Sequence, residues 1–198
     1  MEKRESSDFW LIEKMRMGDE QALEDFVKKY YSQILTYCRL HTQDISYGED
    51  LTQETFIRFF HALPSYHHRG KARNFLYTIA GNLCRDYHRK RKELLLESLT
   101  EQVDSYGIGR TGKVDSLYFL QQSLGEAGKE QEDWDTRITV KMALAQLPEE
   151  IRETAILFFV QEQKQKDIAR ILGIKLSLVK YRIRRAREIL SVYLQEEP

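Results

Sequence analysis

The segment spanning residues 165–190 constrains the fold most, because its small and apolar residues are spaced as in two short helices joined by a tight turn. Ala169 suits the point where two helices cross, Gly173 follows at the turn, and Val179 follows six positions later. Apolar residues then recur at intervals of three and four, which places them on one buried face of the second helix. They are Val179, Ile183, Ala186 and Leu190. We therefore expect residues 136–198 to form a small helical domain.

The opposite face of this second helix indicates contact with DNA. Its polar and basic side chains suit the base edges of the major groove and the phosphates on either side. The candidate residues are Ser177, Lys180, Tyr181, Arg184, Arg185 and Arg187. Chance agreement between the turn spacing, the apolar stripe and the basic face is a poor explanation, so we expect a DNA-binding helix-turn-helix.

The N-terminal part of the chain also has helical periodicity. Asp19 is placed to cap a helix, a second helix is expected to start near Asp50 and end before Pro64, and a third is expected from Arg73 to Lys92. No stretch alternates apolar and polar residues as a half-buried strand does. The sequence therefore predicts an all-α protein in which residues 1–92 form the first of two small helical domains.

The third of these helices has a polar face that suits nucleic acid. Thr78, Asn82, Arg85 and Arg89 fall on one side of it, where amide and guanidinium groups can bind base edges and phosphates. The loop before it is basic and aromatic, a composition that stacks and holds unpaired bases. Its candidate residues are Tyr66, His67, Arg69, Lys71 and Arg73.

The second helix carries an acidic stripe. Asp50, Gln53, Glu54 and Ile57 recur at helical spacing, so an isoleucine lies within a polar face. Such a face resembles a docking surface for a basic protein partner. A face that is merely solvated explains the same pattern equally well.

The net charge of zero conceals strong sorting of charge along the chain. Eight basic residues and one acidic residue lie between positions 69 and 92, and nine basic residues and one acidic residue lie between 164 and 187. Residues 93–135 carry ten acidic and three basic residues and include several glycines. Two basic modules indicate two DNA contacts, and the acidic segment is expected to be a long flexible linker, with short helical pieces at 94–99 and 116–124.

Composition argues against several other classes of protein. Cys38 and Cys84 are too few for a disulfide framework, and neither Cys38 with His41 nor the adjacent His67 and His68 completes a metal site. No phosphate-binding glycine loop or nucleophile motif is present, so we expect no enzyme activity, no cofactor and no small-molecule substrate. No membrane span or signal peptide is apparent, which predicts a cytoplasmic protein.

The chain resembles the extracytoplasmic-function (ECF) group of sigma factors, in the sigma-70 family. The segments 49–60, 75–82 and 86–90 are similar to domain 2 of that family, and 145–152, 167–174 and 179–190 are similar to its domain 4. The resemblance covers both ends of the chain and leaves the middle as the linker of the family.

The resemblance implies an alternative sigma factor that directs RNA polymerase core to −35 and −10 promoter elements and promotes transcription initiation. Asp50, Gln53 and Glu54 would bind the clamp helices of the large subunit, and the flap would be a further core contact. The loop 66–73, with Asn82, would capture unpaired −10 bases, and the helix 177–187 would bind the −35 element. An anti-sigma factor, membrane-bound in many relatives, is a further expected partner.

Departures from the family pattern leave the promoter sequence open. Leu178 and Tyr181 are bulkier than the residues usual at these positions, and Lys175 replaces the usual serine cap, so the start of the recognition helix is expected to shift. The alternative from a different class is a dimeric helix-turn-helix regulator that binds a palindrome without polymerase.

Overall fold

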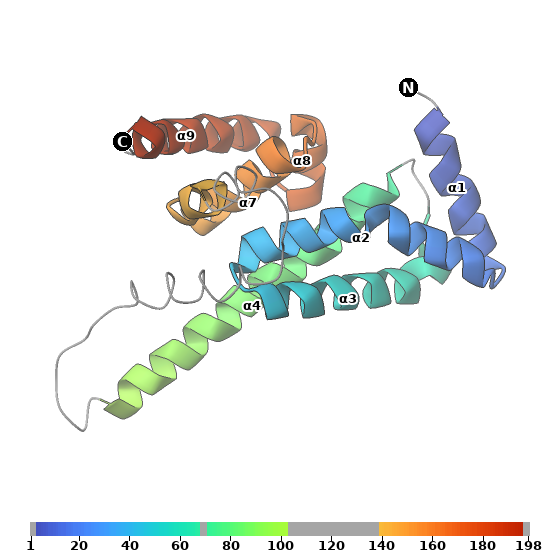
Figure 1. Cartoon of the computed structure of the whole chain (residues 1–198), viewed down its shortest axis with the longest axis horizontal. Coiled ribbons are helices and arrows are strands. Elements are labelled where there is room, and N and C mark those ends of the chain that lie inside the picture. Colours follow the sequence, from blue (N-terminus) through green and yellow to red (C-terminus); the bar gives the residue numbers. More distant parts are fainter. Residues whose placement is uncertain (1–2, 68–70, 103–138, 196–198) are drawn as a thin grey trace.

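The computed structural model describes residues 3–67, 71–102 and 139–195 (Figure 1). All regular elements in these three stretches are helical, as the sequence predicts. The N-terminal unit contains α1 (Lys3–Arg16), α2 (Glu20–Thr42), α3 (Ile45–Ala62), the 3₁₀ turn η1 (Leu63–Ser65) and α4 (Ala72–Gln102). The C-terminal unit contains α7 (Glu149–Ala155), the π-helical turn η2 (Ile156–Val160), α8 (Gln165–Leu172) and α9 (Leu176–Gln195).

Local capping sets the starts of α2 and α3. The Asp19 side chain accepts a hydrogen bond from the Ala22 amide at 3.0 Å, which confirms the predicted cap of α2. Asp44 caps α3 in the same way, accepting from the Tyr47 amide at 3.0 Å. The predicted start near Asp50 is therefore wrong, because the helix already begins at Ile45.

The long helix α4 extends beyond its predicted end at Lys92. It continues to Gln102, because the sequence has no glycine or proline between Lys92 and that point. The piece predicted at 94–99 is thus part of α4. The remainder of the predicted linker, including the piece at 116–124, lies outside the described residues.

The predicted helix-turn-helix is confirmed by the C-terminal unit. Gly173 has a φ of 66°, a left-handed conformation that ends α8, and its amide and that of Ile174 both donate to the Ala169 carbonyl. Val179, Ile183 and Ala186 are buried and Leu190 is half-buried, as their spacing predicts. The helix α9 begins directly after Lys175.

The two units pack against each other. The C-terminal unit lies over α2 and α4 (Figure 1), with α8 against α4 and η2 against α2. As a result, buried side chains of the two units, such as Phe26 and Leu76 in one and Leu157 and Ile168 in the other, form one continuous core. The predicted separate cores therefore meet in this arrangement.

Candidate nucleic-acid and protein interfaces

The outer face of α9 is open to solvent. All six residues predicted for DNA contact on this helix are exposed: Ser177, Lys180, Tyr181, Arg184, Arg185 and Arg187. They share a face because α9 buries Val179, Ile183 and Ala186 on its other side. The structure thus brings together the residues that the sequence predicts for this surface.

The guanidinium groups on the outer face of α9 have only weak local partners. Arg185 pairs with Glu188 at 2.9 Å and Arg184 lies 3.7 Å from the same carboxylate, both on exposed surface. Arg187 lies over the rings of Phe158 and Phe159, 5.8 and 5.7 Å from their centroids. Exposed pairs of this kind contribute roughly 0–1 kcal/mol, so the arginines can exchange them for phosphates.

The acidic stripe lies on the solvent side of α3. Asp50, Gln53 and Ile57 are exposed, whereas Glu54 is half-buried and pairs with Arg58 at 2.7 Å. Ile57 retains 49% of its surface exposure. Arg58 is not among the predicted residues of the stripe, although its position one helical turn after Glu54 was the available signal.

The aromatic loop before α4 is held by α1. Tyr66 stacks on Phe75, with ring centroids 5.1 Å apart and an interplanar angle of 18°. The Arg16 side chain donates hydrogen bonds to the carbonyls of Leu63 and Tyr66, so α1 holds the loop in place. His67 is exposed, and Arg69 lies outside the described residues.

The predicted DNA face of α4 is covered in part by the C-terminal unit. Lys71 forms an ion pair with Asp167, and the Thr78 hydroxyl donates to the Ile171 carbonyl at 3.4 Å. Both partners belong to α8. The face is therefore not open to solvent along its whole length, because the two units bury part of it between them.

The other candidates on α4 remain accessible to different degrees. Asn82 is exposed and accepts a hydrogen bond from Arg85, which is half-buried and also donates to the Gly81 carbonyl at 3.2 Å. Arg89 is exposed and pairs with Asp86 at 2.9 Å, and Arg73 is half-buried.

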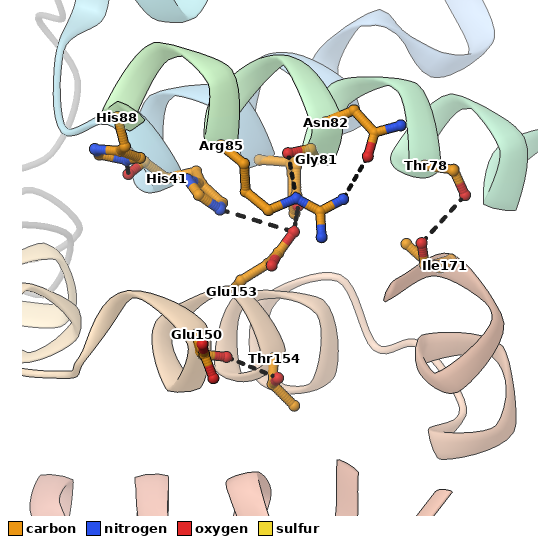
Figure 2. A network of polar contacts seen from close by, with 11 residues as sticks. His41, Thr78, Gly81, Asn82, Arg85, His88, Glu150, Glu153, Thr154 and Ile171 are labelled. Atoms are coloured by element: carbon orange, nitrogen blue, oxygen red, sulfur yellow. Dashed lines mark hydrogen bonds and ion pairs between the residues drawn. The ribbon is translucent and has the colours of Figure 1, made fainter. Parts of the chain in front are cut away.

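A buried polar cluster that was not predicted from the sequence joins the two units (Figure 2). Glu153 of α7 points towards α4 and α2, where its carboxylate accepts a hydrogen bond from the Tyr37 hydroxyl at 3.0 Å. His41 Nε2 lies 3.8 Å from the same carboxylate oxygen. Gly81 leaves room for this carboxylate, since a Cβ there would lie 2.8 Å from Glu153 Oε1. The available signal was the position of Glu153 one helical turn before Ile156 and Leu157, which places an acidic residue on an apolar face.

Burial controls the protonation of this cluster. Removal from water raises the pKa of Glu153, an effect that the positive charge of Arg85 partly offsets. Burial also lowers the pKa of His41 to about 3, with repulsion from His88, Arg152 and Arg85 adding to the effect. His41 is therefore neutral at physiological pH, and it contributes no charge to the contact with Glu153.

The structure offers no metal centre within the stretches it describes. No group of three candidate side chains there could hold a metal ion. Cys38 and Cys84 are both buried, and His41 points towards Glu153. Among the described helices, none is both long and apolar enough to cross a membrane.

Comparison with known proteins identifies both units. Residues 26–93 match the model of Sigma-70 region 2, and residues 137–190 match the model of Sigma-70, region 4. The ECF RNA polymerase sigma factor SigW of Bacillus subtilis is 29% identical over 189 residues, which cover 93% of this chain and 95% of that protein. The B. subtilis RNA polymerase sigma factor YlaC is 27% identical over 171 residues, or 86% and 91% of the two chains.

Solved structures share the same fold. CnrH, in complex with the cytosolic domain of CnrY, aligns with a TM-score of 0.66 and 20% identity, covering 97% of this chain and 99% of that one. The sigma factor RpoE of Bartonella quintana, in complex with the anti-sigma factor NepR, aligns with a TM-score of 0.64 and 20% identity, covering 88% and 98%. The chain belongs to the ECF group of the sigma-70 family and is an alternative sigma factor with regions 2 and 4.

Proposed function

We propose that this protein binds RNA polymerase core and directs it to promoters that carry a −35 and a −10 element. The observation that carries the proposal is the exposed basic face of α9, on a helix-turn-helix that follows a region 2 unit in the same chain. No observation favours the dimeric regulator.

The helix α9 lies in the major groove of the −35 element and binds it there. Ser177, Lys180 and Tyr181 lie in the first half of the helix, where a recognition helix meets base edges. Arg184, Arg185 and Arg187 follow on the same exposed face and bind flanking phosphates. The exposure of all six side chains supports this assignment.

The −10 element is bound as a single strand by the aromatic loop and α4. The stacked rings of Tyr66 and Phe75 provide a surface for an unpaired base. Asn82 supplies hydrogen bonds to a base, Thr78 supplies a hydroxyl group, and the surrounding basic residues contact phosphates. These basic residues are His67, Arg69, Lys71, Arg73, Arg85 and Arg89.

The acidic stripe of α3 is the docking surface for the clamp helices of the polymerase large subunit. Asp50 and Glu54 supply negative charge, and the exposed Ile57 supplies an apolar contact at the C-terminal end of the stripe. The C-terminal unit contacts the flap. We infer that the protein is a non-catalytic subunit, because it supplies binding surfaces rather than reacting groups, and that it acts in the cytoplasm with core polymerase.

An anti-sigma factor is a further proposed partner. CnrH and the Bartonella RpoE are both described in complex with partner proteins, CnrY and NepR. Recovery of core polymerase and no other protein from a lysate with the tagged chain would count against it.

The test is run-off transcription on pooled genomic DNA with core polymerase, with and without the purified protein. New 5′ ends that share a bipartite upstream motif are expected, and they would supply both promoter elements. Asp50→Lys with Glu54→Lys should abolish these starts and core binding, because it reverses the charge of the docking surface.

The control is the same exchange at Glu24 and Glu20, two acidic residues exposed on α2 outside the stripe. It should leave the starts intact. Absence of new starts, together with tight dimeric binding to duplex DNA without polymerase, would support the regulator instead.

A further inference from the structure

We propose that the free protein closes on itself, and that its C-terminal unit covers the surface of α4 that the −10 strand needs. The inference rests on the proposed function, because it concerns the same −10 surface. It adds that promoter DNA and the C-terminal unit of the chain compete for this surface.

The first contact is between Lys71 and Asp167. The Lys71 ammonium pairs with the Asp167 carboxylate, which is 6% exposed in the closed arrangement and is also bound by Arg170 at 3.1 Å. A carboxylate and a phosphate offer the same negative oxygens to an ammonium group. Asp167 therefore occupies Lys71 in the way that a backbone phosphate would.

The second contact covers the middle of α4. The Thr78 hydroxyl donates to the Ile171 carbonyl, and the Tyr77 hydroxyl donates to the Gln161 side chain. Tyr77 is fully buried and Gln161 is 9% exposed, so the C-terminal unit excludes water here. A cavity of about 640 Å³ remains beside these contacts, and it is lined by Tyr66, Phe75 and Lys71 from one unit and Arg170 from the other. The rings proposed to stack on a base thus face the C-terminal unit.

The third contact is the Glu153 cluster, which fixes how the two units fit together. Glu153 is 4% exposed, and its carboxylate is directed at Tyr37, with Arg85 close enough to stabilise its charge (Figure 2). Gly81 gives this carboxylate its space on α4. A buried carboxylate that lost these partners would pay its full desolvation cost, so the cluster specifies this one fit.

The three contacts predict a closed population that weakens −10 binding. When only a fraction of the molecules is open, the measured affinity is the intrinsic affinity multiplied by that fraction. Core polymerase would restore the −10 affinity by binding the two units at separate surfaces, which would hold them apart.

The experiment uses Glu153→Lys in the full chain. A lysine there places a second positive charge beside Arg85 and removes the acceptor of Tyr37. Glu149→Lys is the matched control, because Glu149 lies on the same helix with its side chain exposed. Dyes at Ser46→Cys on α3 and Ser191→Cys on α9 report the separation of the units, since both positions are exposed and the native cysteines are buried.

The second readout is the affinity of the free protein for a single-stranded oligonucleotide with the mapped −10 sequence. Glu153→Lys should move the dyes apart and raise this affinity about tenfold or more, whereas Glu149→Lys should do neither. An unchanged dye distance, or an equal affinity gain in both variants, would overturn the proposal.

A second variant covers the case in which Glu153→Lys fails to fold. Asp167→Asn releases Lys71 and should give a smaller change in the same direction, and no change would count against closure. Run-off transcription by the wild type separates the two hypotheses. Its absence contradicts the proposed function, while the dye distance still decides whether the free chain is closed.

Discussion

The two proposed DNA surfaces differ in their access to solvent. The α9 face is fully exposed, and its arginines pair only with a neighbouring glutamate or lie over aromatic rings. The α4 face is partly covered, with Lys71 and Thr78 bound to α8. One surface can therefore meet DNA as the chain stands, and the other must first be uncovered. The difference places control of promoter binding at the −10 surface.

The largest expected effect concerns the exposed surface. Arg184→Glu with Arg185→Glu should weaken binding of the free protein to a −35 duplex about 100-fold, because each hydrogen bond to a charged phosphate contributes about 1.5–3 kcal/mol. Fluorescence anisotropy at fixed salt measures it. Lys14→Glu with Lys28→Glu makes the same change of net charge at exposed sites on α1 and α2. Equal losses in both variants would show that net charge alone sets the affinity.

The next effect concerns the covered surface. Gly81→Ala adds a Cβ that would lie 2.8 Å from Glu153 Oε1 and 3.0 Å from the Tyr37 hydroxyl. Alanine stabilises a helix interior by about 1 kcal/mol relative to glycine, so α4 itself should gain stability. We nevertheless expect the open fraction, measured with the dye pair, to rise about fivefold. A steric cost of about 1 kcal/mol in the closed form shifts the equilibrium between closed and open forms by about this factor.

The control for this variant is Asn82→Ala, at the exposed neighbouring position. It also favours the helix but adds nothing between the units, so it should leave the open fraction unchanged. A closed Gly81→Ala protein would mean that Glu153 adapts without cost.

A smaller effect links the covered surface to pH. The pKa of His41 is about 3 in the folded protein and 6.5 as an ordinary value, so the unfolded chain takes up this proton first as the pH falls. Protonation of His41 therefore has no effect on stability above pH 6.5, and it lowers the free energy of unfolding increasingly as the pH falls from 6.5 towards 3. His41→Leu should raise the free energy of unfolding by about 1 kcal/mol at pH 7, because both ring nitrogens are buried without hydrogen bonds.

The gain should be larger at pH 5, and urea unfolding at both pH values measures it. The raised pKa of Glu153 acts in the opposite direction, since the folded protein takes up that proton first, and comparison with the wild type at each pH largely removes its contribution. His61→Leu at an exposed site should show no such pH-dependent gain. A gain that does not grow between pH 7 and pH 5 would contradict the buried, neutral state of His41.

The smallest expected effect concerns the ion pairs on the exposed face of α9. Glu188→Gln removes the carboxylate that Arg184 and Arg185 share, so −35 duplex affinity should rise about twofold at low salt. Titration at low and high salt measures it. The gain should vanish at high salt, because exposed ion pairs are screened. A persistent gain would mean that Glu188 opposes DNA by direct contact.

Local signals explain what the sequence could predict. The helix-turn-helix follows from Gly173, Val179 and the apolar stripe, all within a short segment, and the structure has each in its expected place. The capping of α2 by Asp19 is equally local. The start of α3 was missed because Gly48, close behind the Asp44 cap, resembles a helix breaker, whereas in the fold it lets α3 approach Arg39 of α2 closely.

The contact between the units could not be predicted, because its partners lie far apart in the chain. Tyr37 and Glu153 are separated by 116 positions, and Lys71 and Asp167 by 96. Helical periodicity describes which face of one helix is buried, but it does not identify what covers a second face. For this reason Thr78 appeared to be a solvent-facing residue of α4.

The space at Gly81 also has an evolutionary consequence. The Glu153 carboxylate fits only because position 81 has no side chain, so each position limits what the other can hold. A larger residue at 81 calls for a shorter one at 153, and a relative that loses the acid no longer needs the glycine. Across the family the two positions should therefore covary, despite their separation in the chain.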